Sequence, residues 1–157
     1  MGEESGEAAS GSPKLKKFLK EAPFFCKLIQ LVMCVVSVGL IVDPFNNRMQ
    51  GNFNHAGLIY IAVGGYILIN AIFVICYLYG ERTGPKISLM FSRLGAILCF
   101  AAGVVLIYDY KNFQNNYISR YHDQYLNQML ASGVFAILAS VFFAIEMYFI
   151  SKEEEEE

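Results

Sequence analysis

The chain has 157 residues, of which 55% are hydrophobic and 17% charged, and its formal net charge is −2. A water-soluble domain of this size could not cover so much apolar surface with so few polar groups, so the composition excludes an ordinary soluble fold. With no overall basicity and no phosphate-binding glycine loop, the sequence gives no indication of a nucleic-acid partner. The composition favours a protein surrounded by lipid.

Residues 1–23 form a polar arm, in which a stretch rich in Gly, Ser, Ala and Glu precedes four lysines. We expect the first dozen residues to be disordered, because they contain too little apolar surface to fold. The lysines (Lys14, Lys16, Lys17 and Lys20) are expected to hold the arm against anionic lipid. At the other end, residues 151–157 form an acidic tail.

Four apolar segments lie between these ends, at residues 24–42, 56–79, 87–108 and 129–150. Each has about 20 residues, which is the length of helix that crosses a hydrocarbon core about 30 Å thick. Turn-forming residues separate them: Asp43-Pro44, Gly80 to Pro85 and Asn115-Asn116. Because only internal hydrogen bonding is available in lipid, we predict an all-α membrane protein with a four-helix transmembrane domain at residues 24–150.

The cationic residues predict the topology. Nine of the twelve Lys and Arg residues lie in or beside the N-terminal arm, the linker between the second and third segments, and the C-terminal tail. Loops rich in Lys and Arg stay on the cytoplasmic side of a membrane. We therefore predict an M-shaped topology with both termini cytoplasmic, and with residues 43–55 and about 109–128 outside.

Polar residues inside the apolar segments are candidate functional groups. Arg93 and Glu146 are charged, and Gln30 and Asn70 carry amides. An unpaired charge in hydrocarbon costs about 2.5 to 3.5 kcal/mol on insertion scales, so we predict an Arg93–Glu146 ion pair with hydrogen bonds from the two amides. Three interpretations stay open: a structural clasp, snorkelling of the charged side chains to the nearby cytoplasmic interface, or an ion or proton relay in a small channel or transporter subunit.

Small residues recur at every fourth position and predict close helix packing. The set comprises Gly95, Cys99 and Gly103 in the third segment and Ser132, Ala136, Ser140 and Ala144 in the fourth. Such ridges allow helix backbones to approach each other in lipid. We favour packing within one chain over a homo-oligomer contact, which stays open.

Tyrosines and cysteines suggest further surfaces. Tyr117, Tyr121 and Tyr125 share one helical face in the second outer loop, as either an interfacial aromatic belt or a partner-docking surface. Cys26 and Cys76 lie near the inner surface and are either palmitoylation sites or buried packing thiols.

The sequence offers little for catalysis. The two histidines, His55 and His122, stand in separate outer loops, and no clustered metal ligands or nucleophile–base pair accompany them. We therefore expect no enzyme activity, no cofactor and no metal.

Three stretches carry a family resemblance: Cys26 to Val32 at the start of the first segment, Phe91 to Leu98 opening the third, and Ala131 to Leu138 in the fourth. With the brief first outer loop, they resemble the MARVEL-type tetraspan family. Ala101 to Leu106 is similar to the insect snakeskin type of junction tetraspan, and small myoblast-fusion members are also similar. The chain lacks the Trp and paired Cys of claudin loops and the Cys-Cys-Gly motif of tetraspanins.

This resemblance implies a non-enzymatic membrane organiser that acts in cell–cell junction assembly, membrane apposition or vesicle trafficking. The implied location is the plasma membrane at cell contacts, or vesicles. The implied partners are membrane lipids and other membrane or junction proteins, with a homo-oligomer as a further option.

Overall fold

The computed structural model describes residues 13–48, 51–116 and 123–156, and every regular element among them is helical. The elements are α1 (Pro13–Asn46), α2 (Phe53–Ile59), the π-helix η1 (Tyr60–Gly64), α3 (Gly65–Leu78), α4 (Pro85–Asn116) and α5 (Asp123–Glu156). Because α2, η1 and α3 follow one another without a break, these elements form four helices that are long and apolar enough to cross a membrane. The predicted all-α, four-span fold is confirmed.

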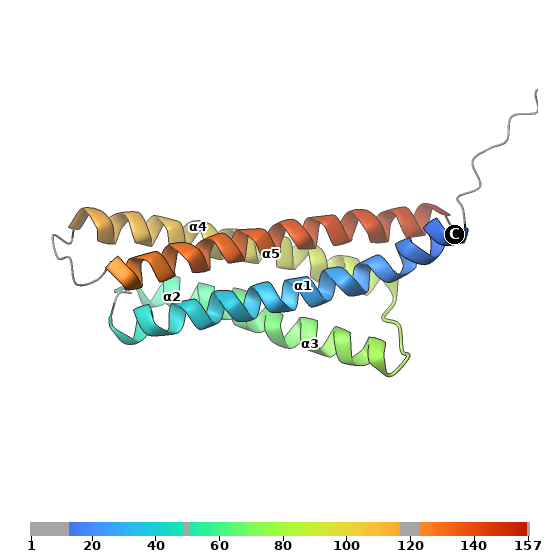
Figure 1. The fold of residues 1–157 in the computed structure, drawn as a ribbon, viewed down its shortest axis with the longest axis horizontal. Coiled ribbons are helices and arrows are strands. Elements are labelled where there is room, and N and C mark those ends of the chain that lie inside the picture. The colour runs from blue at the N-terminus through green and yellow to red at the C-terminus, as the bar shows by residue number, and fades with distance from the viewer. Residues whose placement is uncertain (1–12, 49–50, 117–122, 157) are drawn as a thin grey trace, which may run out of the picture.

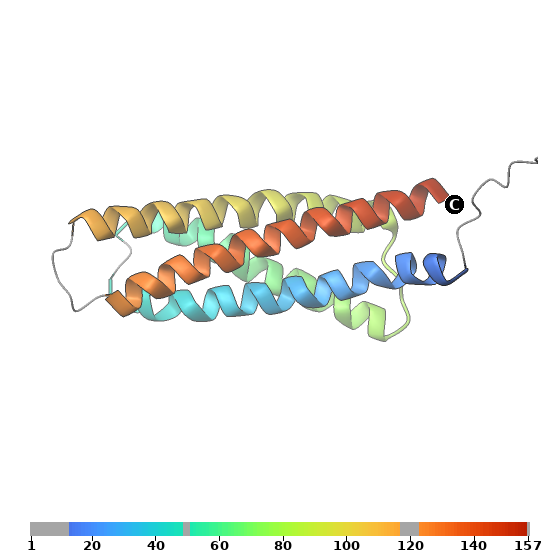
Figure 2. The ribbon, with the colours of Figure 1, turned by 45° about the horizontal axis from the view of Figure 1, so that its top comes forward.

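The helices lie side by side in an elongated bundle (Figures 1 and 2). Helix α5 packs along both α1 and α4, which makes it the central element. The start of α1, the α3–α4 loop and the end of α5 all lie at one end of the bundle (Figure 1). We call this the terminal end, and the other the opposite end.

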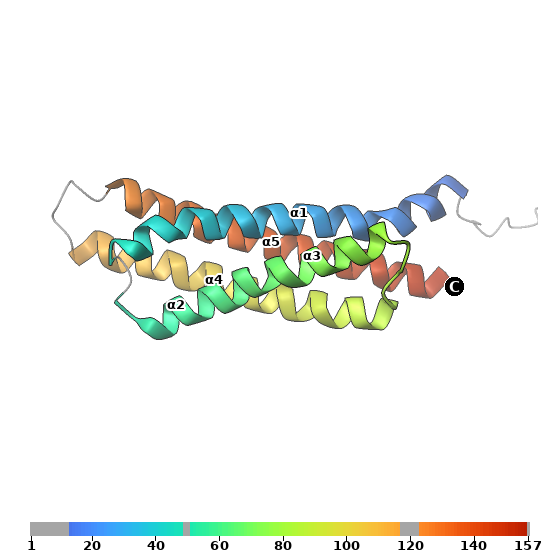
Figure 3. The ribbon, with the colours of Figure 1, turned by 90° about the horizontal axis from the view of Figure 1, so that it is seen from below.

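The second span crosses the bundle obliquely. Its first part, α2, packs on α4, whereas its last part, α3, packs on α1 (Figure 3). The π-helix η1 lies between them, where Gly64 and Gly65 place little side-chain bulk on the helix. As a result α3 has moved away from α4 by the time it reaches the terminal end.

The buried faces follow a seven-residue repeat. From Lys27 onward, the buried positions on α1 are Lys27, Gln30, Cys34, Ser37, Ile41 and Pro44. This alternating spacing of three and four is typical of helices packed at a shallow angle. The outer faces carry large exposed side chains such as Ile61, Leu68 and Ile97, which are 66–72% exposed in the isolated chain and would face lipid.

Several helices extend beyond the predicted apolar segments. Helix α1 begins at Pro13, so the second half of the arm predicted for residues 1–23 is helical, while the first dozen residues lie outside the described part. Pro44, predicted to mark a turn, lies inside α1, and α4 continues past Tyr108 to Asn116. Hydropathy marks where lipid ends, but a helix continues until its sequence breaks it.

The predicted turn from Gly80 to Pro85 is present. Gly80 has a φ of 81°, a left-handed conformation that glycine adopts without strain. Its N–H donates to the Tyr77 carbonyl and the Glu81 N–H donates to the Cys76 carbonyl, both at 3.0 Å, which closes α3 with a Schellman motif. Pro85 then occupies the first position of α4, where its missing N–H costs nothing.

Candidate functional site at the terminal end

A buried carboxylate near the terminal end receives donors from two other helices. Glu146 of α5 is 0% exposed, and its Oε2 accepts a hydrogen bond from Gln30 Nε2 of α1 at 2.8 Å. Lys27 Nζ of α1 forms an ion pair with the same oxygen at 3.1 Å, and Ser92 Oγ of α4 donates to it at 2.9 Å. Ser88 Oγ lies 3.5 Å from Oε1. We call Lys27, Gln30, Ser88, Ser92 and Glu146 the polar cluster.

The ammonium of Lys27 is as well enclosed as its partner. Lys27 is 5% exposed, and its Nζ also lies 3.4 Å from Ser92 Oγ. The same nitrogen lies 4.6 Å from the ring centre of Phe73 in α3 and 5.6 Å from that of Phe143 in α5. Cation–π contact of this kind is strengthened where water is excluded. All four spans therefore contribute to holding one ion pair.

The predicted Arg93–Glu146 ion pair is wrong. Arg93 is exposed and forms no ion pair with any residue in the described part of the chain, whereas its neighbour Ser92 is fully buried. Adjacent residues on a helix point about 100° apart, so only one of the two can face the bundle. Lys27 is the partner that the sequence interpretation missed. The sequence does contain a sign of this role. Lys27 lies three residues before Gln30, which places both residues on the same buried face of α1.

The two predicted amides differ. Gln30 joins the polar cluster, but its Oε1 has no hydrogen-bond partner among the described residues. Asn70 is buried in α3, and both of its amide atoms lack partners in the same described part. Burying an amide without hydrogen-bond partners costs about 1–3 kcal/mol. These atoms therefore need water or another polar group as a hydrogen-bond partner.

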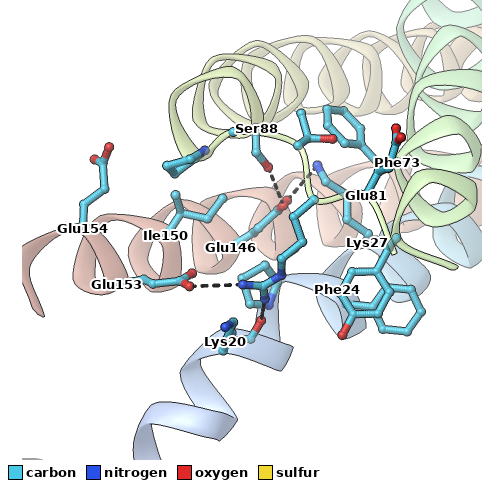
Figure 4. A pocket seen from close by; sticks show the side chains of 16 residues that line it. Lys20, Phe24, Lys27, Phe73, Glu81, Ser88, Glu146, Ile150, Glu153 and Glu154 are labelled. Atoms are coloured by element: carbon cyan, nitrogen blue, oxygen red, sulfur yellow. Dashed lines mark hydrogen bonds and ion pairs between the residues drawn. The ribbon is translucent and has the colours of Figure 1, made fainter. Parts of the chain in front are cut away.

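A cavity of about 240 Å³ opens beside the polar cluster (Figure 4). Lys27, Ser88 and Glu146 line its inner part, and Lys20, Arg82 and Glu153 line its outer part. Arg82 donates to the carbonyl oxygen of Lys20 and lies 3.6 Å from Glu153 Oε1. The cavity exists because α3 diverges from α4 at this end and the α3–α4 loop spans the gap.

Residues 18–149 match the family model of MARVEL, described as a membrane-associating domain. This range reaches from the first turns of α1 into the last turns of α5 and contains the whole polar cluster. The chain belongs to the MARVEL family. No curated protein and no solved structure matched it. With four apolar helices and a MARVEL domain, it is an integral multi-pass membrane protein.

Small residues do bring the helices of this MARVEL bundle together. A Cβ on Gly103 would lie 2.9 Å from the Gly133 carbonyl oxygen, so α4 and α5 approach closely there. Gly95 faces Tyr66 and Phe143, whose rings would lie 2.7 and 2.8 Å from its Cβ. These contacts agree with the interpretation of packing within one chain.

The predicted ridge on α5 is correct only in part. Ser132 is buried and pairs with Ser37, whose hydroxyl oxygens are 2.9 Å apart, and Ala136 is also buried. Ser140 is buried but donates to Ile137 of its own helix. Ala144 is exposed. Residues four positions apart on a helix differ in direction by about 40°. Ala144 lies three such intervals beyond Ser132, so it points about 120° away from it and off the buried face.

At the opposite end of the MARVEL bundle, His55 and Asp109 form a pair that the sequence interpretation missed. His55 Nδ1 lies 2.9 Å from Asp109 Oδ1, which joins α2 to α4. Both residues were assigned to outer loops from the sequence, whereas in the structure both belong to helices. Their pairing was therefore not predicted. Of the predicted tyrosine face, Tyr125 is half-buried against the core, and Tyr117 and Tyr121 lie outside the described residues.

The two candidate acylation sites differ in exposure. Cys26 is 7% exposed, whereas Cys76 is half-buried. Acylation of Cys26 would require its side chain to leave the bundle, so Cys76 is the more accessible thiol. Among the described residues of this MARVEL protein, no group of three or more His, Cys, Asp or Glu side chains could hold a metal ion.

Proposed function

We propose that this protein is a non-enzymatic membrane organiser that acts in cell–cell junction assembly, membrane apposition or vesicle trafficking. The observation that supports this most is the MARVEL match over residues 18–149, on a bundle whose outer surface is apolar along its length. Such a surface engages lipid and the transmembrane helices of other proteins, which are the partners we propose. A second copy of the chain is among them.

A channel or transporter subunit is the weaker alternative. The charged part of the polar cluster lies near one end. The buried residues beyond it are mostly apolar, such as Cys34, Tyr66, Cys99 and Phe143, and the polar ones among them, Asn70 and the Ser37–Ser132 pair, are uncharged. A conduction pathway needs polar groups or water through the whole depth of the membrane. The arrangement therefore favours a clasp that holds the four spans together.

We propose that the terminal end faces the cytoplasm, because most Lys and Arg residues lie there. Single cysteines introduced at Glu81 and at Asn52, in a background without the four native cysteines, are expected to respond oppositely to an impermeant maleimide on intact cells. Cys at position 52 should be labelled, and Cys at position 81 only after permeabilisation. Labelling of position 81 on intact cells would reverse the proposed topology.

The organiser function predicts a non-uniform distribution in cells. The full chain, tagged at its C-terminus at the endogenous locus, is expected to concentrate at cell contacts or on vesicles, as judged by imaging against a uniform membrane dye. The matched control is the Lys27→Glu variant, which removes the ion pair and should be retained during biosynthesis. Uniform distribution of the folded native protein would contradict the proposed function.

A further inference from the structure

The cavity at the terminal end lies where lipid headgroups would be. Lys20 precedes the first apolar segment, Arg82 follows the second and Glu153 follows the fourth, so all three stand at the boundary between apolar span and polar flank. Phe24 and Tyr77 stack beside the cavity with ring centres 4.1 Å apart. Aromatic rings at this level are typical of the membrane interface.

The charges lining the cavity have both signs. Lys27 and Glu146 neutralise each other at its inner part (Figure 4). Lys20 and Arg82 remain as cations, and Glu81, Glu153 and Glu154 as carboxylates, around the outer part. Apart from the 3.6 Å approach of Arg82 to Glu153, none of these five side chains has an ion pair within the described residues. A ligand with one anionic and one cationic group is complementary to this arrangement.

The carboxylates of the outer part narrow the choice between the two common zwitterionic headgroups, phosphoethanolamine and phosphocholine. Phosphocholine is larger by its three methyl groups and has no N–H to donate. A primary ammonium can donate three hydrogen bonds to carboxylates.

We propose that the cavity binds the headgroup of phosphatidylethanolamine, with the phosphodiester beside Arg82 and Lys20 and the ammonium beside Glu153. This site does not depend on where in the cell the protein acts. It gives the bundle a lipid preference that its apolar outer surface alone would not have.

The test uses the purified full chain in detergent, with phosphatidylethanolamine, phosphatidylcholine or phosphatidylglycerol of identical acyl chains. Lipid retention is measured by native mass spectrometry. We expect phosphatidylethanolamine to bind about tenfold more tightly than either other lipid, a ratio that one charge-assisted hydrogen bond can supply. Equal retention of all three, or preference for phosphatidylglycerol, would overturn the proposal.

Paired variants separate the cavity from general charge effects. Arg82→Gln and Glu153→Gln remove groups that line the cavity, and each is expected to weaken phosphatidylethanolamine binding about fivefold or more. Lys86→Gln and Glu155→Gln remove the same charges from nearby exposed positions outside it, and should leave binding unchanged. Unfolding temperatures without lipid verify that all four variants fold. Equal effects within each pair would show that the cavity is not the binding site.

Discussion

Lys27→Glu and Glu146→Lys, made singly, are expected each to lower the free energy of unfolding by about 3–5 kcal/mol, which is the cost of breaking a buried ion pair. In Lys27→Glu, two carboxylates would face each other at positions that are 5% and 0% exposed. Only Gln30 and Ser92 would remain to donate hydrogen bonds to them. The measurement is SDS-induced unfolding in mixed micelles, followed by circular dichroism. A small domain has only about 5–15 kcal/mol of stability, so poor expression of the single variants is part of the expected result.

The double variant Lys27→Glu with Glu146→Lys should recover at least half of the loss. The geometry allows the exchange, because Gln30 can turn its amide so that Oε1, which has no partner among the described residues, accepts from the new ammonium. Ser92 can accept as well, since its hydroxyl rotates. Arg93→Gln is the matched control and should change stability by less than about 1 kcal/mol, because Arg93 is exposed. A double variant no more stable than the worse single variant would refute the clasp.

The identity of the ion pair illustrates what the sequence could not determine. Hydropathy located the four spans, because lipid imposes the same length requirement on each of them. It could not say how each helix is rotated about its axis, and that rotation decides whether Ser92 or Arg93 faces Glu146. The seven-residue repeat through Lys27, Gln30 and Cys34 contained that information, but Lys27 was counted among the charges that set the topology.

The cavity and the His55–Asp109 pair depend on tertiary structure in a further way. Both arise from the oblique path of the second span, which brings α2 to α4 and α3 to α1. Nothing in the pattern of an apolar segment specifies its tilt, since tilt is set by the neighbours on which it packs. The turn at Gly80, by contrast, was predictable, because its chemistry is local.

Gly103→Ala is expected to destabilise the bundle by about 1–3 kcal/mol, as overpacking does in a tightly packed interior. The new Cβ would lie 2.6 Å from Ile137 Cγ1, which can rotate away, but also 2.9 Å from the Gly133 carbonyl oxygen and 3.2 Å from the Ile137 amide nitrogen. Backbone atoms of a helix cannot yield singly, so α4 and α5 must separate over several turns. The loss is measured by the same SDS-induced unfolding.

Gly39→Ala is the matched control, because a Cβ on this exposed residue of α1 meets nothing within 4 Å. There alanine should raise stability by up to about 1 kcal/mol through its better helix propensity, so the two substitutions are expected to differ in sign. Gly133→Ala should fall between them, since its nearest contacts are 3.1 and 3.2 Å. If Gly103→Ala proved as harmless as Gly39→Ala, the close approach of α4 and α5 could not be what holds these two spans together, and the polar cluster would have to do so alone.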